Sequence, residues 1–500
     1  MKVALAQINT CVGDLEGNVE RCLAAIEAAR RQGAALVVLP EMAIPGYPPR
    51  DILFDASFAE AVFEATADLA RRAHGGPPAV VGSLARADRQ PPGHPGLYNA
   101  ALLLQGGEAR QVAAKRLLPA YDVFFEPRWF LPGPPSPPTT VAGKRLGFLV
   151  CEDLWDEGYQ VHPPAELLTA GAELLVCLAA SPYQRQVMEQ RLYHARRQRC
   201  PLVYVNLCGG NDELIFDGRS FALDKQGRRI AQLAGFEEEV RLVDLETDTF
   251  AGPAEDSPEA ELFRALVLGV RDFAHKNRLE CAVLGLSGGV DSATVAAIAA
   301  EALGPDRVTA VAIPSRYTDP RSTTSARQLA QALGIHFKVV DLERLHAAAE
   351  DTLAGLLEEE TAAENVQARL RAMILMSLVN RYGGLLLNTS NKTELALGYA
   401  TIYGDMAGTL SPLGDLTKPE VVALARWIDS ARGVMPRFTL ERPPSAELRP
   451  EQVDPFDYAE VAPAMERLVQ ENRGNLALRR SEHKRWQMGV ILKVSQKSFG

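Results

Sequence analysis

The segment from Cys281 to Leu303 limits most strongly how this chain can fold. An apolar run over residues 281–286 ends in the turn Ser287-Gly288-Gly289-Val290-Asp291-Ser292, and a helical pattern follows over residues 292–303. Strand, glycine turn and helix in this order are typical of a parallel sheet covered by helices on both faces. Strand or helix patterns recur over residues 307–314, 326–333, 337–340 and 384–389, so we expect a parallel α/β domain over residues 261–500.

The first half of the chain also alternates short apolar runs with helical patterns, which predicts a layered α/β domain over residues 1–245. Residues 20–32 form a helical pattern with one apolar face. The proline-rich pieces at residues 91–92 and 132–138 are predicted loops. Residues 246–260 have no periodicity and are predicted to link the two domains. The strand candidates are residues 3–8, 35–39, 79–84, 100–104, 145–151, 173–179 and 202–207.

Length and composition limit the class of protein. Five hundred residues are more than a single hydrophobic core usually organises, which agrees with two domains. A net charge of -10 argues against a nucleic-acid partner, since phosphate-binding surfaces are basic. The first apolar run is too short for a secretion signal, and no apolar stretch approaches the roughly 18 residues that span a bilayer, so we expect a soluble, cytoplasmic protein without a membrane partner. Seven scattered cysteines favour free thiols.

Three residues in the first half suggest amide chemistry. Glu41 and Cys151 each follow a buried apolar strand, where functional groups of open α/β sheets collect. A thiol that attacks an amide needs a base and a cation near the developing oxyanion, for which Glu41 and Lys115 are the candidates. Each residue alone also has a simpler explanation, because a cysteine at a strand end is usually a core residue and a lone glutamate or lysine is usually a surface charge.

The local context of these residues resembles a known family. Leu39-Pro40-Glu41, Lys115-Arg116-Leu117-Leu118-Pro119 and Cys151-Glu152-Asp153-Leu154-Trp155 resemble nitrilase-type amidohydrolases, which implies an αββα sandwich. The continuation Tyr121, Phe124, Glu126, Arg128, Trp129, Phe130 narrows the resemblance to the glutaminase domains of glutamine-dependent NAD synthetases. The resemblance implies glutamine contacts at Tyr121 and Ser181. A third pocket position, where family members commonly carry lysine, is Val187 here.

The glycine turn of the second half has the features of a phosphate site. Adjacent glycines let backbone N–H groups face a polyanion, and the following helix start adds partial positive charge. Asp291 is a candidate Mg²⁺ ligand. The run Leu286 to Ser292 resembles the loop of the ATP pyrophosphatase superfamily, which implies a Rossmann-like fold and cleavage of ATP between its α and β phosphates. No lysine follows, unlike in the Gly-Lys-Ser/Thr loop.

Segments downstream of the turn resemble NAD synthetases. The matching segments are residues 364–369, 388–399, 403–408, 415–418 and 443–448. The resemblance implies that ATP meets Leu286, Ser287, Gly288, Gly289, Val290, Asp291, Ser292, Thr389, Lys418 and Ser445. It implies that deamido-NAD meets Asn365, Arg369, Glu394 and Lys484, and that Asp291 and Glu394 hold Mg²⁺. Taken singly, Arg369 is equally explained by a pairing on its own helix, and Lys418 by an exposed helix start.

The whole pattern predicts an amide-forming ligase of the glutamine-dependent NAD synthetase family. Its resemblance implies amidation of deamido-NAD to NAD, with ATP as co-substrate and ammonia released from glutamine. It also implies an ammonia channel between the sites and a homo-oligomer, an octamer in family members. Two alternatives stay open: an amidotransferase that acts on another carboxylate through an adenylate, and a non-catalytic nucleotide-binding or scaffolding protein.

Overall fold

The computed structural model describes every residue except 248, 251, 254–255, 472–475 and 500. Four positions of the predicted linker therefore lie outside the described residues. Contacts within the chain divide it into two compact units. The first contains Met1–Asn211 and Ile215–Glu255, and the second contains Asp212–Leu214 and Asp256–Gly500. None of the described helices combines the length and apolarity needed to cross a bilayer.

The first unit contains two six-stranded mixed sheets. One has the order β14-β1-β2-β3-β4-β5, with β1, β2 and β3 parallel, and the other has the order β13-β12-β9-β8-β7-β6, with β7, β8 and β9 parallel. A separate two-stranded ribbon pairs β10 with β11. The strands are β1 (Lys2–Gln7), β2 (Leu36–Val38), β3 (Ala79–Arg86), β4 (Leu97–Gln105), β5 (Glu108–Ala114), β6 (Thr139–Val141), β7 (Lys144–Val150), β8 (Leu174–Ala179), β9 (Leu202–Asn206), β10 (Cys208–Asn211), β11 (Leu214–Asp217), β12 (Phe221–Leu223), β13 (Arg229–Gln232) and β14 (Glu239–Asp244).

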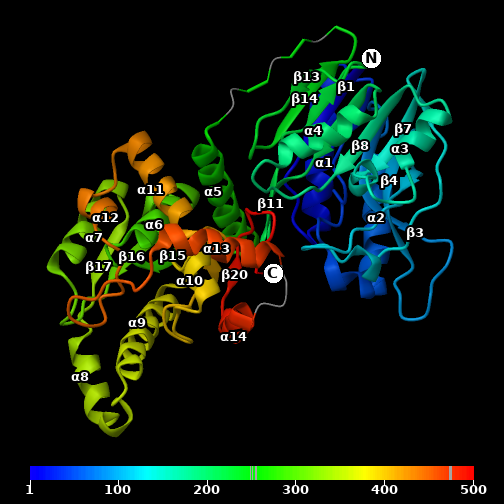
Figure 1. Ribbon diagram of the computed structural model, residues 1–500. Coiled ribbons are helices and arrows are strands. Elements are labelled where there is room, and N and C mark those ends of the chain that lie inside the picture. Colours follow the sequence, from blue (N-terminus) through cyan, green and yellow to red (C-terminus); the bar gives the residue numbers. More distant parts are fainter. Residues whose placement is uncertain (248, 251, 254–255, 472–475, 500) are drawn as a thin grey trace. The chain divides into compact units, whose positions relative to one another are not determined.

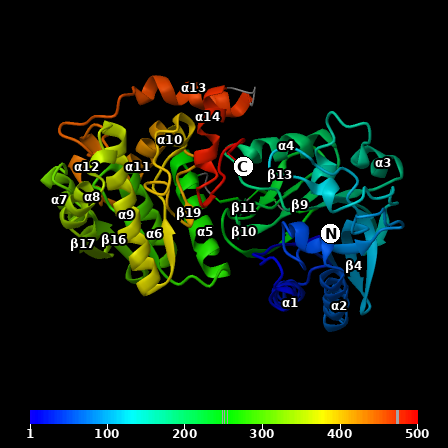
Figure 2. The same ribbon diagram turned by 90° about the horizontal axis from the view of Figure 1, so that it is seen from below.

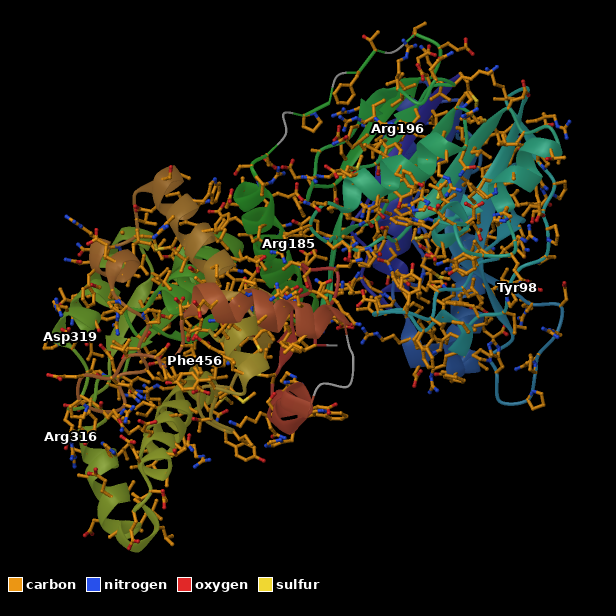
Figure 3. The ribbon with its side chains drawn as sticks, in the orientation of Figure 1. Tyr98, Arg185, Arg196, Arg316, Asp319 and Phe456 are labelled. Atoms are coloured by element: carbon orange, nitrogen blue, oxygen red, sulfur yellow. The ribbon has the colours of Figure 1, made fainter. Side chains whose placement is uncertain are left out.

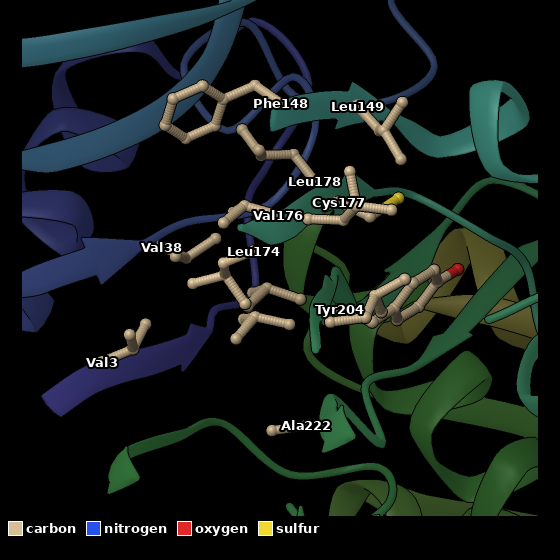
Figure 4. Packing of buried hydrophobic residues seen from close by; sticks show 14 of the residues in the cluster. Val3, Val38, Phe148, Leu149, Leu174, Val176, Cys177, Leu178, Tyr204 and Ala222 are labelled. Carbon is tan, nitrogen blue, oxygen red and sulfur yellow. The ribbon is translucent and has the colours of Figure 1, made fainter. Parts of the chain in front are cut away.

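Helices cover the outer faces of these two sheets. Figure 2 shows α1 (Leu15–Arg31) and α2 (Ala56–Arg72) on one side of the strands and α3 (Pro163–Thr169) and α4 (Val187–Arg197) on the other. Apolar side chains from both sheets, among them Val3, Val38, Val176 and Tyr204, form one buried cluster between them (Figure 4). The predicted αββα sandwich is confirmed.

The seven strand candidates of the first half all form strands, with ends shifted by a few residues. The predicted helix over residues 20–32 begins earlier, at Leu15, because Asp14 accepts a hydrogen bond from the Gly17 amide and caps it. Both proline-rich pieces are loops, as predicted. All seven cysteines are free thiols, which confirms the prediction from their number and spacing.

The second unit contains one six-stranded sheet in the order β17-β16-β15-β18-β19-β20, and every pairing is parallel. The strands are β15 (Ala282–Gly285), β16 (Val308–Ala312), β17 (His336–Val339), β18 (Leu385–Leu387), β19 (Leu410–Ser411) and β20 (Val490–Ile491). The helices, labelled in Figure 1, are α5 (Pro258–Lys276), α6 (Val290–Leu303), α7 (Pro320–Leu333), α8 (Glu343–Thr352), α9 (Glu360–Tyr382), α10 (Lys392–Leu397), α11 (Lys418–Arg432), α12 (Arg437–Glu441), α13 (Tyr458–Glu471) and α14 (Leu476–Arg485).

Helices pack on both faces of this sheet. Val283 of β15 and Leu386 of β18 share a buried cluster with Ile374 of α9. Neighbouring residues of a strand point to opposite faces, so Leu284 faces the other side, where α6 packs on β15 and β16. The central parallel sheet predicted from the glycine turn is confirmed, and the turn lies at the carboxyl end of the central strand β15.

Candidate active sites

Glu41 and Lys115 form a buried ion pair in the first unit. Glu41 follows β2 and Lys115 follows β5 directly, and their side chains are 0% and 1% exposed. Lys115 Nζ lies 2.9 Å from Glu41 Oε1. Gly82 of β3 makes room for this arrangement, since a Cβ there would lie 2.5 Å from Glu41 Cα. The two residues predicted as base and cation are therefore in contact.

A second buried carboxylate, Glu126, shares the same ammonium. Its Oε1 lies 2.8 Å from Lys115 Nζ and accepts a hydrogen bond from the Tyr47 hydroxyl at 2.8 Å. Burial raises the pKa of Glu126 to about 7, against the influence of Lys115. Burial also opposes the charged form of Lys115, but Glu126 and Glu41 outweigh it and raise the pKa of that amine well above its ordinary value. Lys115 therefore carries a fixed positive charge.

Cys151 begins the short 3-10 helix η3 (Cys151–Leu154) directly after β7. Its φ of +43° lies in the left-handed region, which is rare for a residue with a side chain and is concentrated at functional sites. Burial, with Glu41 adding to it and Lys115 opposing, raises the pKa of the Cys151 thiol well above its ordinary value. The resting thiol is therefore protonated, and its nucleophilic form requires a base nearby.

Asp153 ties the cysteine turn to the lysine segment. Its Oδ2 accepts a hydrogen bond from the Val150 amide at 3.1 Å, and its Oδ1 accepts from the amides of Arg116 at 2.8 Å and Leu117 at 3.0 Å. Burial raises the pKa of Asp153 to about 6 in spite of these three donors. One side chain thereby fixes the position of Cys151 relative to Lys115.

Two of the three predicted glutamine contacts, Tyr121 and Ser181, carry hydroxyl groups, and Tyr121 lies against the cysteine turn. The Tyr121 hydroxyl donates to Glu152 Oε1 at 3.0 Å, and its ring is half exposed. Ser181 follows β8 and is held by the Asn206 amide side chain and by Arg191. Val187 is the first residue of α4 and is buried, 4% exposed, so it offers an apolar group only.

The predicted phosphate loop joins β15 to α6. Gly288 has φ +82°, and a Cβ there would lie 2.4 Å from the Ser322 carbonyl oxygen, so only glycine fits. The Ser287 and Ser292 hydroxyls are 3.1 Å apart, and Ser292 Oγ also donates to the Gly289 carbonyl. Gly289 is the N-cap residue of α6, and no side chain of the described residues caps this helix start, so its first amides can face an anion.

A cavity of about 180 Å³ lies over this loop. Its lining contains the predicted nucleotide or metal residues Ser287, Gly289, Val290, Asp291, Ser292, Thr389, Glu394, Lys418 and Ser445. Leu286 lines an adjoining, more apolar cavity of about 250 Å³ that also contains Ser287 and Thr389. Gly288 lines neither cavity. The ring of Tyr399, in the first cavity, packs edge-on against Phe456 at 5.2 Å (Figure 3).

Two carboxylates and one lysine meet in the smaller cavity. Lys418 Nζ pairs with Asp291 and lies 3.5 Å from Glu394 Oε1, while the Asn391 amide donates to Asp291 at 3.0 Å. Burial, then the charge of Asp291, raises the pKa of Glu394 to about 8. Carboxylate oxygens beside a phosphate site suit Mg²⁺, which needs only one or two protein ligands there. No group of three or more His, Cys, Asp or Glu side chains arranged for a metal occurs in the described part of the chain.

The other predicted deamido-NAD residues gather around the segment 398–402. Asn365 accepts from the Thr401 hydroxyl at 2.6 Å, and Arg369 Nε donates to the Ile402 carbonyl at 3.2 Å. Lys484 Nζ donates to the carbonyls of residues 398 and 400 at 2.6 and 2.8 Å. Glu394 is separate from this group, since it lies with Asp291 and Lys418 in the phosphate cavity.

Some residues at these sites were not predicted to act there. Glu126 lies in the segment that resembles the glutaminase domains, but its contact with Lys115 is made only in the folded chain and could not be predicted from the sequence. Asn99, inside the apolar run of β4, donates to Glu41 Oε1 at 2.6 Å. Arg442 adds a second cation to the phosphate cavity and donates to Ser322 Oγ at 2.6 Å. Its position directly before the recognised Pro443-Pro444-Ser445 segment is a signal that could have identified it.

Comparison with known proteins agrees with both sites. The carbon-nitrogen hydrolase family model matches residues 2–251, and the NAD synthase family model matches residues 262–498. The glutamine-dependent NAD(+) synthetase of Synechocystis sp. is 38% identical over 100% of this chain and 97% of its own length. The chain belongs to the glutamine-dependent NAD(+) synthetases. The synthetase of Rhodobacter capsulatus is 40% identical over 94% of this chain and 88% of its own length.

A solved structure supports the family membership. The glutamine-dependent NAD+ synthetase of Acinetobacter baumannii, solved in complex with adenosine diphosphate, is 29% identical, with a TM-score of 0.82 over 100% of this chain and 97% of its own. The predicted family, the αββα fold of the first half and the parallel α/β fold of the second half are therefore confirmed.

Proposed function

We propose that this enzyme releases ammonia from glutamine at Cys151 and uses it, with ATP, to convert the nicotinate carboxylate of deamido-NAD into the carboxamide of NAD. The observation that carries the proposal is the presence of both sites, a buried Glu-Lys pair beside a cysteine and a Ser-Gly-Gly phosphate loop, in one chain that matches glutamine-dependent NAD(+) synthetases over its full length.

In the first unit, Glu41 takes the thiol proton and Cys151 Sγ attacks the glutamine carboxamide carbon. Lys115 stabilises the oxyanion of the tetrahedral intermediate. It can do so because Glu41 and Glu126 keep its amine positively charged. Glu41 returns the proton to the nitrogen, the C–N bond breaks, and ammonia leaves. Water activated by Glu41 then hydrolyses the thioester and releases glutamate. Tyr121 and Ser181 hold the amino-acid end of glutamine, and Val187 contributes apolar contact.

In the second unit, an oxygen of the nicotinate carboxylate attacks the α-phosphorus of ATP and pyrophosphate leaves. Ammonia attacks the carbonyl carbon of the resulting acyl adenylate and AMP leaves. The loop from Leu286 to Ser292, with Thr389, Lys418 and Ser445, holds ATP, and Lys418 supplies charge to the phosphates. Asn365, Arg369 and Lys484 contact deamido-NAD, and Glu394 contacts deamido-NAD and Mg²⁺.

Mg²⁺ fits the carboxylates of this cavity. Asp291 and Glu394 would hold it, and its charge would neutralise the pyrophosphate oxygens.

We further propose a homo-oligomer and direct use of the released ammonia. Helix α9 exposes Met373 and Met376 by 49% and 41%, so this helix is the candidate surface for a second copy. Neutral ammonia is scarce at neutral pH, so transfer through a channel gives a concentration advantage over release to solvent.

The adenylate step has a direct test. Deamido-NAD labelled with ¹⁸O in its carboxylate is incubated with ATP, Mg²⁺ and ammonium, and the products are analysed by mass spectrometry. The proposal expects AMP and pyrophosphate, with one ¹⁸O in AMP and one retained in NAD. Formation of ADP and phosphate, or AMP without label, would contradict it. A Lys418→Met variant, expected to lose this reaction and to keep glutamine hydrolysis, is the matched control.

A further inference from the structure

The two oxygens of the buried Glu41 carboxylate have unequal sets of donors. Oε1 accepts from Lys115 Nζ at 2.9 Å and from Asn99 Nδ2 at 2.6 Å, whereas Oε2 accepts from the Ala180 amide at 2.7 Å. Because a carboxylate oxygen has two lone pairs, Oε1 is fully occupied and Oε2 keeps one place for a proton. Asn99 and Lys115 both donate N–H groups to Oε1. While these two hydrogen bonds are made, Oε1 has no free lone pair that could accept the thiol proton.

The hydrogen bond from Asn99 to Glu41 leaves another polar atom of the Asn99 side chain unpaired among the described residues. Asn99 follows Tyr98 on β4 (Figure 3), and its side chain is fully buried. Among the described residues, its Oδ1 has no hydrogen-bond partner, and a buried unpaired acceptor destabilises the folded state. Turning the amide over would place Oδ1 2.6 Å from a carboxylate oxygen, where two acceptors repel, so the NH₂ group must face Glu41. The backbone carbonyl of Asn99 accepts a hydrogen bond from the backbone amide of Lys115 at 2.8 Å.

We propose that Asn99 is a positioning residue of the glutamine reaction: it occupies Glu41 Oε1 together with Lys115 and thereby directs the proton of Cys151 to Oε2. This inference rests on the proposed role of Glu41 as the base. During the reaction, the S–H bond breaks, Oε2 receives the proton, and the same oxygen later delivers it to the departing nitrogen.

The other titratable groups around Glu41 cannot substitute for Asn99. Lys115, from the end of β5, is shared with Glu126 of the 3-10 helix η2 (Glu126–Arg128). Cys151 and Glu152 approach from η3, and the Glu152 carboxylate accepts from Tyr121 and from the Tyr159 hydroxyl. Of the hydrogen bonds to Glu41 within the described residues, the one from Asn99 is the only one donated by a neutral side chain.

The test compares Asn99→Ala with Ser83→Ala in the full chain. Ser83, one strand away on β3, is also fully buried, and within the described residues its hydroxyl bonds only the Thr66 hydroxyl, at 2.9 Å. Asn99→Ala is expected to lower kcat for glutamine hydrolysis on the order of 10- to 100-fold with the KM for glutamine changed less than about twofold. The acid limb of the pH profile is expected to move up by about one to two units, since an ionised base loses a donor. Ser83→Ala is expected to keep the wild-type profile.

NAD formation with ammonium in place of glutamine reports whether the second unit of each variant is intact, because it uses only the second site. An unchanged KM for glutamine reports whether the first unit, which contains Asn99 and Ser83, is folded. Asn99→Asp keeps the side-chain volume and replaces the donor by a carboxyl group, so it is expected to shift the acid limb at least as far. Either variant with wild-type kcat and pH profile would overturn the proposal. So would a fall in the rates with both nitrogen donors and an unmoved profile, which indicates a structural role. Failure of the wild-type enzyme to hydrolyse glutamine would instead refute the proposed function.

Discussion

The ion pair of Arg191 in α4 with Asp217 in β11 should be a main determinant of the stability of the first unit. Both side chains are 0% exposed. Arg191 Nη1 lies 2.8 and 3.0 Å from the two Asp217 oxygens, and Nη2 donates to the Ser181 carbonyl at 2.8 Å. Arg219 Nε lies farther away, 4.0 Å from Asp217 Oδ2, so the loss of Arg191 leaves a buried carboxylate with its close partner gone, which costs about 3–5 kcal/mol. Arg191→Met should therefore lower the free energy of unfolding of this unit by that amount.

Removing both partners should cost much less than the sum of the single changes. Asp217→Leu alone leaves a buried guanidinium and is expected to cost about 3–5 kcal/mol as well. The combined Arg191→Met, Asp217→Leu variant buries no charge, so its loss should be no larger than that of either single variant. This corresponds to a coupling free energy of at least about 3 kcal/mol.

The measurement is urea unfolding followed by tryptophan fluorescence. The background carries Trp427→Phe and Trp486→Phe, so that both remaining tryptophans, Trp129 and Trp155, belong to the first unit. Trp155 packs 4.5 Å from the ring of His194 in α4, the helix that carries the arginine. Additive losses in the double variant, or single losses below about 1 kcal/mol as for exposed pairs, would show that the buried ion pair contributes no coupling to stability.

Two further predictions concern the second unit. Gly288→Ala should abolish NAD formation with either nitrogen donor and leave glutamine hydrolysis intact, because its Cβ would meet the Ser322 carbonyl at 2.4 Å. The control Gly355→Ala should have no effect, since a Cβ there meets nothing within 4 Å. Equal activities of the two variants would contradict this prediction. Glu394, with its pKa raised to about 8 by burial and Asp291, adds to stability below about pH 4.5 and loses that contribution as pH rises through about 8. Binding of Mg²⁺ and ATP at pH 7 should therefore release a proton, measured by calorimetry in buffers of different ionisation enthalpy, and Glu394→Gln should bind without release; release by that variant would exclude this carboxyl as the source.

The sequence predicts those site residues that directly follow an apolar strand. Glu41, Cys151 and Ser287 could be found in this way, because a buried strand has a clear pattern and its end is where function collects. The contacts of Asn99 could not be predicted, because an asparagine inside an apolar run gives no sign of which neighbouring strand it faces. The left-handed backbone of Cys151 is likewise a property of the folded turn.

The same distinction holds for the fold. The parallel sheet of the second unit was predictable because β15 and β16 are apolar runs joined to helices. The strands β19 and β20 were not, since each has only two residues and depends on its partner for its conformation. The ribbon of β10 and β11 begins with Cys208-Gly209-Gly210-Asn211. The two glycines and the asparagine of this segment favour a turn by sequence alone.

The most direct test of the account is NAD formation from deamido-NAD, ATP and Mg²⁺, with glutamine or ammonium as nitrogen donor, by the wild-type enzyme and by Cys151→Ala. We expect that the wild type uses both donors, and that the variant loses glutamine and keeps ammonium at an unchanged rate. Glutamine-driven NAD formation by Cys151→Ala would contradict the assigned nucleophile. Absence of NAD from both donors in the wild type would contradict the assigned substrate.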